Sequence, residues 1–338
     1  MKAESFDQVA LAHGGGGQLT DRLLEQVVWP RLSNPLLDEL LDSGIIQSIP
    51  GRPALTLDSF VVKPLFFPGG DLGRLAVCGT VNDLAVSGAR PQGLALGMIL
   101  EEGLPRGVLE KILDSVSEAS REAGVPVITG DTKVVGRGQA DGIFLTTAGI
   151  GIIPEGRVLH PKKIAPGDVL LISGTLADHG LAVMLARQMP ELKSALRSDA
   201  APLNGLIERL LAAVPGVVFL RDPTRAGLAG VASDLAKTTG HLFVLDEKRI
   251  PVLPETRHAA EMLGLDPLEV ANEGKVFVVV RPEDAQKALE ALRGHPYGEK
   301  SEIIGRVEKG PARCEILTAI GGRRILQKPY GEQLPRIC

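Results

Sequence analysis

Cysteine and aromatic residues are scarce in this sequence. Its 338 residues include three cysteines, Cys78, Cys314 and Cys338, and no CxxC pair. That spacing gives neither a disulfide framework nor a zinc site. Aromatic residues make up 3% of the chain and hydrophobic residues 44%, so the cores must be built from aliphatic side chains.

Long apolar runs and an excess of basic charge are also absent. The start of the chain has no apolar run of signal-peptide length, and no stretch approaches the ~20 apolar residues of a membrane span. The net charge is -4 and the pI is near 5.9, whereas a nucleic-acid-binding protein normally shows a basic patch and a high pI. We therefore expect a soluble, cytoplasmic protein that does not bind nucleic acid.

Glycine, by contrast, is abundant. It accounts for 40 of 338 residues, about 12% where ~7% is usual, and it is favoured where a backbone approaches a ligand or turns sharply. The length suits two domains. The proline- and glycine-spaced segment 154–167 predicts a linker between a first domain over 1–153 and a second over 168–320, with a flexible tail over 321–338.

Strands and helices alternate along the chain, which predicts an α/β (α+β) fold. In the first half we expect strands at 54–62, 94–100, 125–129 and 142–153, and helices at 72–87 and 105–123. In the second half we expect strands at 168–173, 217–220, 276–280, 301–307 and 314–317, and helices near 180–187, 203–213, 224–237 and 282–292.

A run of four glycines stands near the start, in His13-Gly14-Gly15-Gly16-Gly17-Gln18. Four glycines cannot form a stable helix or strand interior. Because a helix is predicted next, their N–H groups could wrap an anion. A flexible N-terminal segment is the alternative, and no Walker sequence is present because no GK[ST] follows.

Aspartates occupy conspicuous places. Asp58 stands at or near a strand end, Asp131 and Lys133 follow the strand at 125–129, and Asp222 follows the strand at 217–220. Acids there face a metal nucleotide in many α/β sites. Thr224 is a plausible cap for the next helix. Taken by spacing alone, these acids form only a weak signal.

Asp83 stands within the apolar stripe predicted for the helix at 72–87, with Asn82 on its shoulder. An unpaired buried carboxylate is costly, so Asp83 should have a cation or several donors. A satisfied structural aspartate is the alternative interpretation.

The chain ends in Pro335-Arg336-Ile337-Cys338. A terminal cysteine after proline- and glycine-bearing sequence can act as a nucleophilic thiol on a tether, and Arg336 would favour its thiolate. A stray terminal thiol is the alternative. Prenylation is excluded because that signal needs cysteine four residues from the end.

Several of these pieces resemble the PurM-like ATP-binding superfamily, which includes aminoimidazole ribonucleotide (AIR) synthetase, selenophosphate synthetase and thiamine-monophosphate kinase. The matching pieces are Thr56-Leu57-Asp58, Asn82-Asp83-Leu84-Ala85-Val86-Ser87-Gly88-Ala89, Gly130-Asp131-Thr132 and Asp222-Pro223-Thr224-Arg225-Ala226-Gly227. Three more narrow the resemblance to the HypE family of hydrogenase maturation proteins. These are Ala12 to Gln18, Asn272-Glu273-Gly274-Lys275 and the terminal Pro335-Arg336-Ile337-Cys338.

The resemblance implies a homodimer whose N-terminal strands build a shared β-barrel, with ATP and Mg²⁺ in a cleft between the domains near the dimer interface. It also implies that a HypF-type carbamoyltransferase loads Cys338 with a carbamoyl group. ATP-dependent dehydration would then give a thiocyanate, and the cyano group would pass to iron on a HypC–HypD complex as a ligand of [NiFe] hydrogenase.

The resemblance also suggests roles for single residues. Asp58, Asp83 and Asp222 would hold the metal, and Lys133 would stabilise phosphate or developing charge. Glu273 is the candidate base that removes protons from the amide nitrogen, with a turn-stabilising surface acid as the alternative. The residues expected to bind the nucleotide are His13, Gly14, Gly15, Gly16, Gly17, Asn82, Asp131 and Thr132. Asp131 could reach the metal directly or through water, and His13 and Gln18 could close over the nucleotide or only bracket a loop.

Two other functions compete. Selenophosphate synthetase typically carries a reactive cysteine or selenocysteine in its glycine-rich segment, and residues 14–17 contain none. A non-catalytic scaffold that docks partners through its tail would leave the acids and the glycine loop without a purpose. For the dehydratase we expect the tail from Gly321 to Cys338 to alternate between an inward position near the γ-phosphate and an outward, exposed one.

Overall fold

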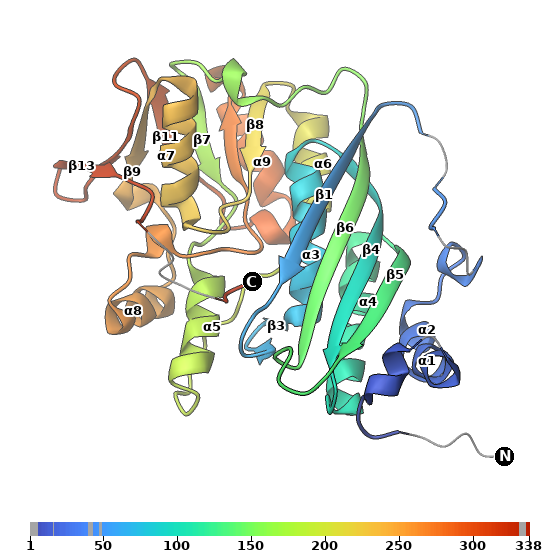
Figure 1. Ribbon diagram of the computed structural model, residues 1–338. Helices are drawn as coiled ribbons and strands as arrows, with labels where there is room; N and C mark the ends of the chain where they lie inside the picture. Colours follow the sequence, from blue (N-terminus) through green and yellow to red (C-terminus); the bar gives the residue numbers. More distant parts are fainter. Residues whose placement is uncertain (1–5, 16, 40–42, 47–48, 331–335) are drawn as a thin grey trace.

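A computed structural model describes residues 6–15, 17–39, 43–46, 49–330 and 336–338. Two sheets, each with its own helices, lie side by side (Figure 1). No helix in these ranges is long and apolar enough to cross a bilayer. The two-domain α/β prediction is confirmed.

The first sheet has four strands in the order β1-β6-β4-β5. Only β4 and β5 run parallel; β6 pairs antiparallel with both β1 and β4. The bounds are β1 (Arg52–Phe60), β4 (Arg90–Glu101), β5 (Val127–Val135) and β6 (Ile143–Ile153), with a small hairpin of β2 (Phe66–Phe67) and β3 (Gly70–Asp71).

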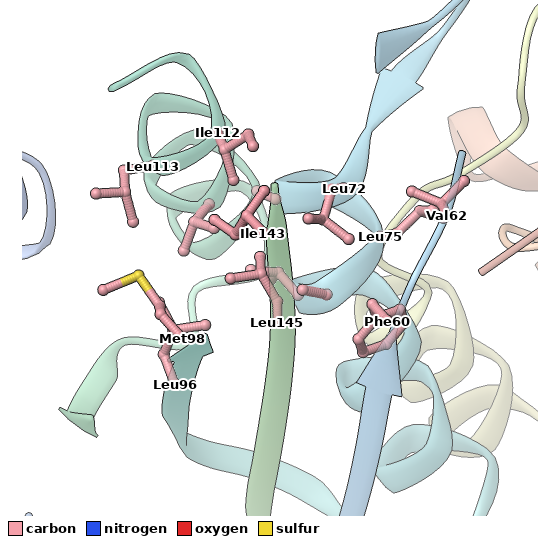
Figure 2. Close-up of a cluster of buried hydrophobic side chains, with 14 of the residues drawn as sticks. Phe60, Val62, Leu72, Leu75, Leu96, Met98, Ile112, Leu113, Ile143 and Leu145 are labelled. Atoms are coloured by element: carbon pink, nitrogen blue, oxygen red, sulfur yellow. The ribbon is translucent and has the colours of Figure 1, made fainter. Parts of the chain in front are cut away.

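One face of this sheet is covered by α3 (Leu72–Val86) and α4 (Arg106–Ala123). Alternation of buried and half-buried residues along β6 follows the period of two expected for a strand between two unlike faces. The core between sheet and helices is mainly aliphatic, as expected from the scarcity of aromatics, with Phe60 among its few rings (Figure 2). On the opposite face Leu55, Leu57 and Ile99 are exposed, at 76%, 66% and 41% of their full area.

The N-terminal segment lies beside the β5 edge. It consists of η1 (Leu11–Gly14), α1 (Gln18–Leu23), η2 (Leu24–Val28), α2 (Trp29–Leu32) and η3 (Leu37–Glu39). A helix does follow the glycine run, as predicted, since Gly17 is the N-cap of α1.

The second sheet has seven strands in the order β13-β12-β9-β11-β7-β10-β8, antiparallel except for β12 and β9. Its strands are β7 (Val169–Ile172), β8 (Val217–Arg221), β9 (Leu242–Asp246), β10 (Phe277–Val280), β11 (Glu302–Glu308), β12 (Cys314–Leu317) and β13 (Arg323–Leu326). Its helices are α5 (Asp178–Gln188), α6 (Asn204–Ala213), α7 (Gly227–Thr239), α8 (Pro254–Leu263) and α9 (Ala285–Arg293). Short 3-10 turns are η4 (Pro161–Lys163), η5 (Glu247–Arg249), η6 (Pro267–Glu269), η7 (Pro282–Asp284) and η8 (Pro296–Gly298).

Helix α3 joins the two units because it packs on the first sheet and also on α6. The Asn82 side chain donates to the backbone oxygens of Ala201 (3.0 Å) and Glu273 (3.2 Å) and accepts from Leu203 N (2.7 Å). These bonds use three of the four hydrogen-bonding positions of this buried amide, so Asn82 fixes one domain against the other.

Three local predictions were wrong. Asn82 is buried and Asp83 only half-buried, the reverse of the expected stripe, because α3 is enclosed on both sides and has no single apolar face. Gly130 to Lys133 lie inside β5 rather than after it, since the strand runs on through Val134 and Val135. Thr224 does not cap α7, whose N-cap is Ala226 in a left-handed conformation with no side-chain hydrogen bond.

The tail prediction also needs correction. Residues 323–326 of the expected tail form β13, which pairs with β12 from Leu317↔Arg323 to Cys314↔Leu326. Sequence reasoning also missed β9 and α8. Part of the segment, residues 331–335, lies outside the described residues.

Close packing of α3 on α4 predicts a stability effect at Gly73. A Cβ there would stand 2.2 Å from the Ile112 backbone oxygen, whereas a Cβ on Gly107 in α4 would meet nothing within 4 Å. We expect Gly73→Ala to lower the free energy of unfolding by about 2 kcal/mol through overpacking, and the control Gly107→Ala to raise it by about 0.5 kcal/mol. Urea denaturation of the two variants measures both, and equal stabilities would contradict the packing.

Candidate active site

Strand β1 and helix α3 bring two carboxylates together. Thr80 Oγ1 donates to Asp58 Oδ2 at 3.3 Å, and Thr56 Oγ1 donates to Asp83 Oδ2 at 2.9 Å. Each threonine belongs to the element that carries the other acid. The strand and the helix are therefore cross-linked through the two acids.

Asp222 approaches from the second unit, directly after β8 ends at Arg221. Its loop is held by Asn272, whose Nδ2 donates to Pro223 O at 2.9 Å. The loop turns into α7 at Gly227 (φ 55°), where a Cβ would stand 2.5 Å from the Val270 backbone oxygen. Glycine is required there by both the backbone conformation and the close approach.

Glu273 lies buried on the same side of the second unit, with 4% of its area exposed. Its backbone N donates to Asp199 Oδ1 at 3.0 Å, while Oε1 has no hydrogen-bond partner among the residues that the structure describes. Lys275 Nζ lies 2.9 Å from Asp199 Oδ2, so Asp199 ties the loop at two points. The alternative of a surface turn acid is wrong, because the side chain is enclosed.

These acids act on one another electrostatically. Burial, followed by the charges of Asp83 and Asp58, raises the pKa of Asp222 to about 7. Burial raises the pKa of Glu273 well above its ordinary value, and Asp222 is the strongest of the acids that add to it. Burial and Asp83 likewise raise the pKa of Asp58. Such mutual repulsion is what a bound cation relieves.

The carboxylates suit a cation that arrives with phosphates. Among the described residues, no three His, Cys, Asp or Glu side chains are arranged to hold a metal ion by themselves. Mg²⁺ commonly uses one or two carboxylates and takes its remaining ligands from water and substrate phosphates. The donor set of Asp58, Asp83 and Asp222 therefore fits a magnesium nucleotide better than a resident metal.

The C-terminal cysteine lies at the end of β1, between that strand and α5 (Figure 1). Val61 N donates to Cys338 O at 3.2 Å. Val61 is three residues after Asp58, roughly 10 Å along an extended chain. The terminal cysteine is thus docked at the end of the strand that carries Asp58.

Glu273 faces the same region. A Cβ on Gly79 would stand 2.9 Å from Phe60 Cζ and 3.9 Å from Glu273 Oε2. Phe60 precedes Val61, which holds the tail. A glycine on α3 therefore leaves room for the Glu273 carboxylate to face the end of β1.

A second group of predicted residues lies at the other edge of the first sheet. Gly14 touches Val134 of β5, and Lys133 and Asp131 form an exposed ion pair at 3.2 Å on that strand. His13 is buried, and its Nε2 has no hydrogen-bond partner in the described part of the chain. Thr132 shares β5, Gly15 and Gly17 follow η1, and Gly16 lies outside the described residues.

Within one chain the two groups are kept apart, because β5 is separated from β1 by β6 and β4. Three strand spacings amount to roughly 14 Å. A cavity of about 300 Å³ opens beside Asp131 and Thr132, lined mainly by apolar residues of the N-terminal segment and of β4 and β5. Prediction from sequence did not anticipate this separation.

Several residues at the site were missed from the sequence. Thr56 and Thr80 hold the acids, Asp199 holds the Glu273 loop, and His179 and Arg187 of α5 contact the tail. Thr56 stood inside a quoted motif, whereas the other four gave no local signal.

Comparison with known proteins identifies the family to which this two-domain architecture belongs. Residues 42–153 match the AIR synthase related protein N-terminal domain, and residues 165–314 match the C-terminal domain of the same family. These two matches show that the chain is an AIR synthase related protein.

Similar proteins and solved structures identify the particular family within this class. Carbamoyl dehydratase HypE of Azotobacter vinelandii is 46% identical over 331 residues, covering 98% of this chain and 97% of the relative. The crystal structure of the hydrogenase maturation protein HypE in complex with ATP superposes with a TM-score of 0.93 at 42% identity, over 97% of this chain and 99% of the other. A HypE–HypF complex matches with a TM-score of 0.80 at 46% identity, over 91% and 99%. The chain therefore belongs to the HypE family of AIR synthase related proteins, several of whose members are named carbamoyl dehydratases.

The raised pKa of Asp222 predicts how stability depends on pH. The folded chain holds this proton up to about pH 7, while the unfolded chain releases it near the ordinary pKa of 3.8. The contribution of Asp222 to the free energy of unfolding therefore falls as pH rises from about 4 to about 7, and stays flat above.

Asp222→Asn removes that charge. Because Asp222 is only partly enclosed, we expect the variant to exceed the wild type by on the order of 2 kcal/mol at pH 8, less than the full pKa shift would give. Near pH 4.5 the two should differ little. Urea denaturation without nucleotide at both pH values is the measurement. If the difference in unfolding free energy between the variant and the wild type does not grow with pH, the neighbouring acids do not raise the pKa of Asp222.

Proposed function

We propose that this chain is an ATP-dependent carbamoyl dehydratase that converts an S-carbamoyl group on Cys338 into an S-cyanate during [NiFe] hydrogenase maturation. The observation that carries this proposal is the docking of the terminal cysteine at the end of β1, the strand that bears Asp58. The names of its relatives point to the same activity.

The reaction can be written with its atoms in balance. The carbamoyl oxygen attacks the γ-phosphorus, and the bond to ADP breaks. The amide nitrogen loses one proton, which leaves a C=N bond and a phosphorylated oxygen. The C–O bond then breaks, phosphate leaves, and the nitrogen loses its second proton to give S–C≡N. The products are the S-cyanate, ADP and phosphate.

Glu273 would accept protons from the nitrogen. A carboxylate with a raised pKa is a stronger base than an exposed one, and it is effective once deprotonated near the operating pH. Burial and the neighbouring acids raise the pKa of Glu273, and no described residue forms a hydrogen bond with its Oε1. Asp199 and Lys275 fix the loop behind it.

Asp58, Asp83 and Asp222 would hold Mg²⁺ together with the phosphates. A magnesium ion, when bound, would neutralise charge on the transferred phosphoryl group. The acids themselves would orient it between the two domains, since Asp58 and Asp83 come from the first unit and Asp222 from the second.

A homodimer would complete the site. The exposed face of the first sheet carries Leu55 and Leu57, which no described part of the chain covers, and a contiguous apolar face usually marks an interface. Packing two such sheets into the expected shared β-barrel would let His13, Gly14, Asp131, Thr132 and Lys133 of one subunit approach the acids of the other. Lys133 would then face phosphate, as the sequence predicts.

Partners follow from the chemistry. The thiol must be carbamoylated by another enzyme, and a HypF-type carbamoyltransferase fits, given the HypE–HypF complex among the similar structures. A HypC–HypD complex would receive the cyano group. The cytoplasmic location expected from the sequence belongs to the same proposal.

Glu273→Gln separates loading from dehydration. The glutamine keeps the shape of the side chain but cannot accept a proton, so we expect a loss of about 10²-fold or more in dehydration rate, while carbamoyl transfer to Cys338 continues. Mass spectrometry of the C-terminal peptide before and after magnesium ATP measures both steps.

The matched control is Glu269→Gln, a half-buried acid of η6 near the same loop, which should dehydrate at the wild-type rate. If Glu273→Gln forms the nitrile as fast as the control does, Glu273 is not the base.

A further inference from the structure

The end of the chain pairs with the segment that follows β1. Lys63 N donates to Arg336 O and Val61 N donates to Cys338 O, both at 3.2 Å. The two bonds advance in opposite directions along the two segments, which is the pattern of an antiparallel strand pair. Residues 336–338 therefore add to the end of β1 as a short strand, a common way to bind an extended peptide.

Helix α5 supplies the second wall. Arg187 Nε donates to Lys63 O at 2.7 Å, and its guanidinium also donates to Arg336 O at 2.6 Å. His179 Nε2 lies 3.0 Å from Ile337 O, and Nδ1 lies 2.8 Å from Ser198 Oγ. A carbonyl can only accept, so Nε2 carries the proton and donates. Both backbone carbonyls before the cysteine are thus held by α5.

Side chains of the tail are held as well. Arg336 donates to Asp141 Oδ2 at 2.6 Å and through Nε to Val61 O at 3.0 Å. Lys63 Nζ reaches the same Asp141 oxygen at 3.1 Å. Ile337 is 4% exposed and packs into the core of the first unit. Arg336 adopts a left-handed conformation (φ 56°), which a non-glycine residue keeps only where its surroundings impose it.

We propose that Val61, Lys63, Asp141, His179 and Arg187 form a peptide-binding groove that recognises a C-terminal Arg-Ile-Cys by its main chain, its arginine charge and its buried isoleucine. We call these five residues the tail groove. They are positioning residues, because they hold the segment before the thiol rather than the reacting atoms.

The ionic part of the groove holds the tail only weakly. The Arg336–Asp141 and Lys63–Asp141 pairs lie at the surface, with side chains 36% to 58% exposed, and exposed pairs bind weakly. If the chain acts as proposed above, the groove would set how often Cys338 leaves for the loading enzyme. That consequence rests on the proposed function, whereas the groove itself does not.

The test is the rate at which iodoacetamide alkylates Cys338, read by peptide mass in the full chain without nucleotide. Cys78 and Cys314 are buried and report general loosening in the same sample. We expect Cys338 to react about threefold faster in Asp141→Asn and about tenfold faster in His179→Phe, with Cys78 and Cys314 unchanged. The matched control is Asp114→Asn, which removes an acid of α4 that lies 2.7 Å from Arg31. It should leave all three rates unchanged.

A double variant tests the pairing itself. Asp141→Asn with Arg336→Gln should react little faster than Arg336→Gln alone, because the two residues contribute one shared interaction. The groove would be overturned if the rate increases of the two single variants multiplied in the double variant. It would also be overturned if Cys338 reacted no faster than in the control when Asp141→Asn and Arg187→Met are each tested alone.

Activity measurements distinguish failure of this proposal from failure of the proposed function. Asp141→Asn should accept the carbamoyl group at least as fast as the wild type and dehydrate it more slowly. Faster alkylation with unchanged dehydration would be consistent with the dehydratase activity, and it would show that the groove has no part in the reaction. Absence of dehydration in the wild type would leave the alkylation result standing alone.

Discussion

Repulsion among four carboxylates at the junction of the two units, one buried and three half-buried, is the constraint on which this structure depends. Asp58 and Asp83 come from one unit, and Asp222 and Glu273 from the other. Each domain brings negative charge to the junction, where burial and the neighbouring acids raise the pKa of Asp58, Asp222 and Glu273. The fold tolerates this because Asn82 and the packing of α3 on α6 hold the domains together independently of the acids.

The proposed function asks Cys338 to be loaded by another enzyme and then enclosed at this junction. A residue inside a rigid strand could not do both. Docking by three residues at the end of β1 places Cys338 near Asp58 through main-chain hydrogen bonds. These can be broken and remade without disturbing the sheet. The covalent tether makes docking intramolecular, so individually weak contacts are sufficient.

Much of this could be predicted from local sequence. Helices α3 (Leu72–Val86) and α4 (Arg106–Ala123) lie within one residue of the predicted ranges 72–87 and 105–123. Asp58 and Asp222 could be located because each belongs to a strand or its end. Prediction failed where long-range contact decides. Local periodicity could not show that α3 is enclosed on two sides, so the predicted burial of Asn82 and Asp83 was the reverse of the observed burial. Nor could it show that Asp141, His179 and Arg187, far apart in sequence, meet at one tail.

Intact mass of the wild-type chain tests the central claim most directly. After incubation with a carbamoyl-transferring enzyme, the C-terminal peptide should gain one carbamoyl group on Cys338, and magnesium ATP should then remove the mass of one water from that peptide. A modification that persists in Cys338→Ala, or a carbamoylated Cys338 that magnesium ATP leaves unchanged, would contradict the account.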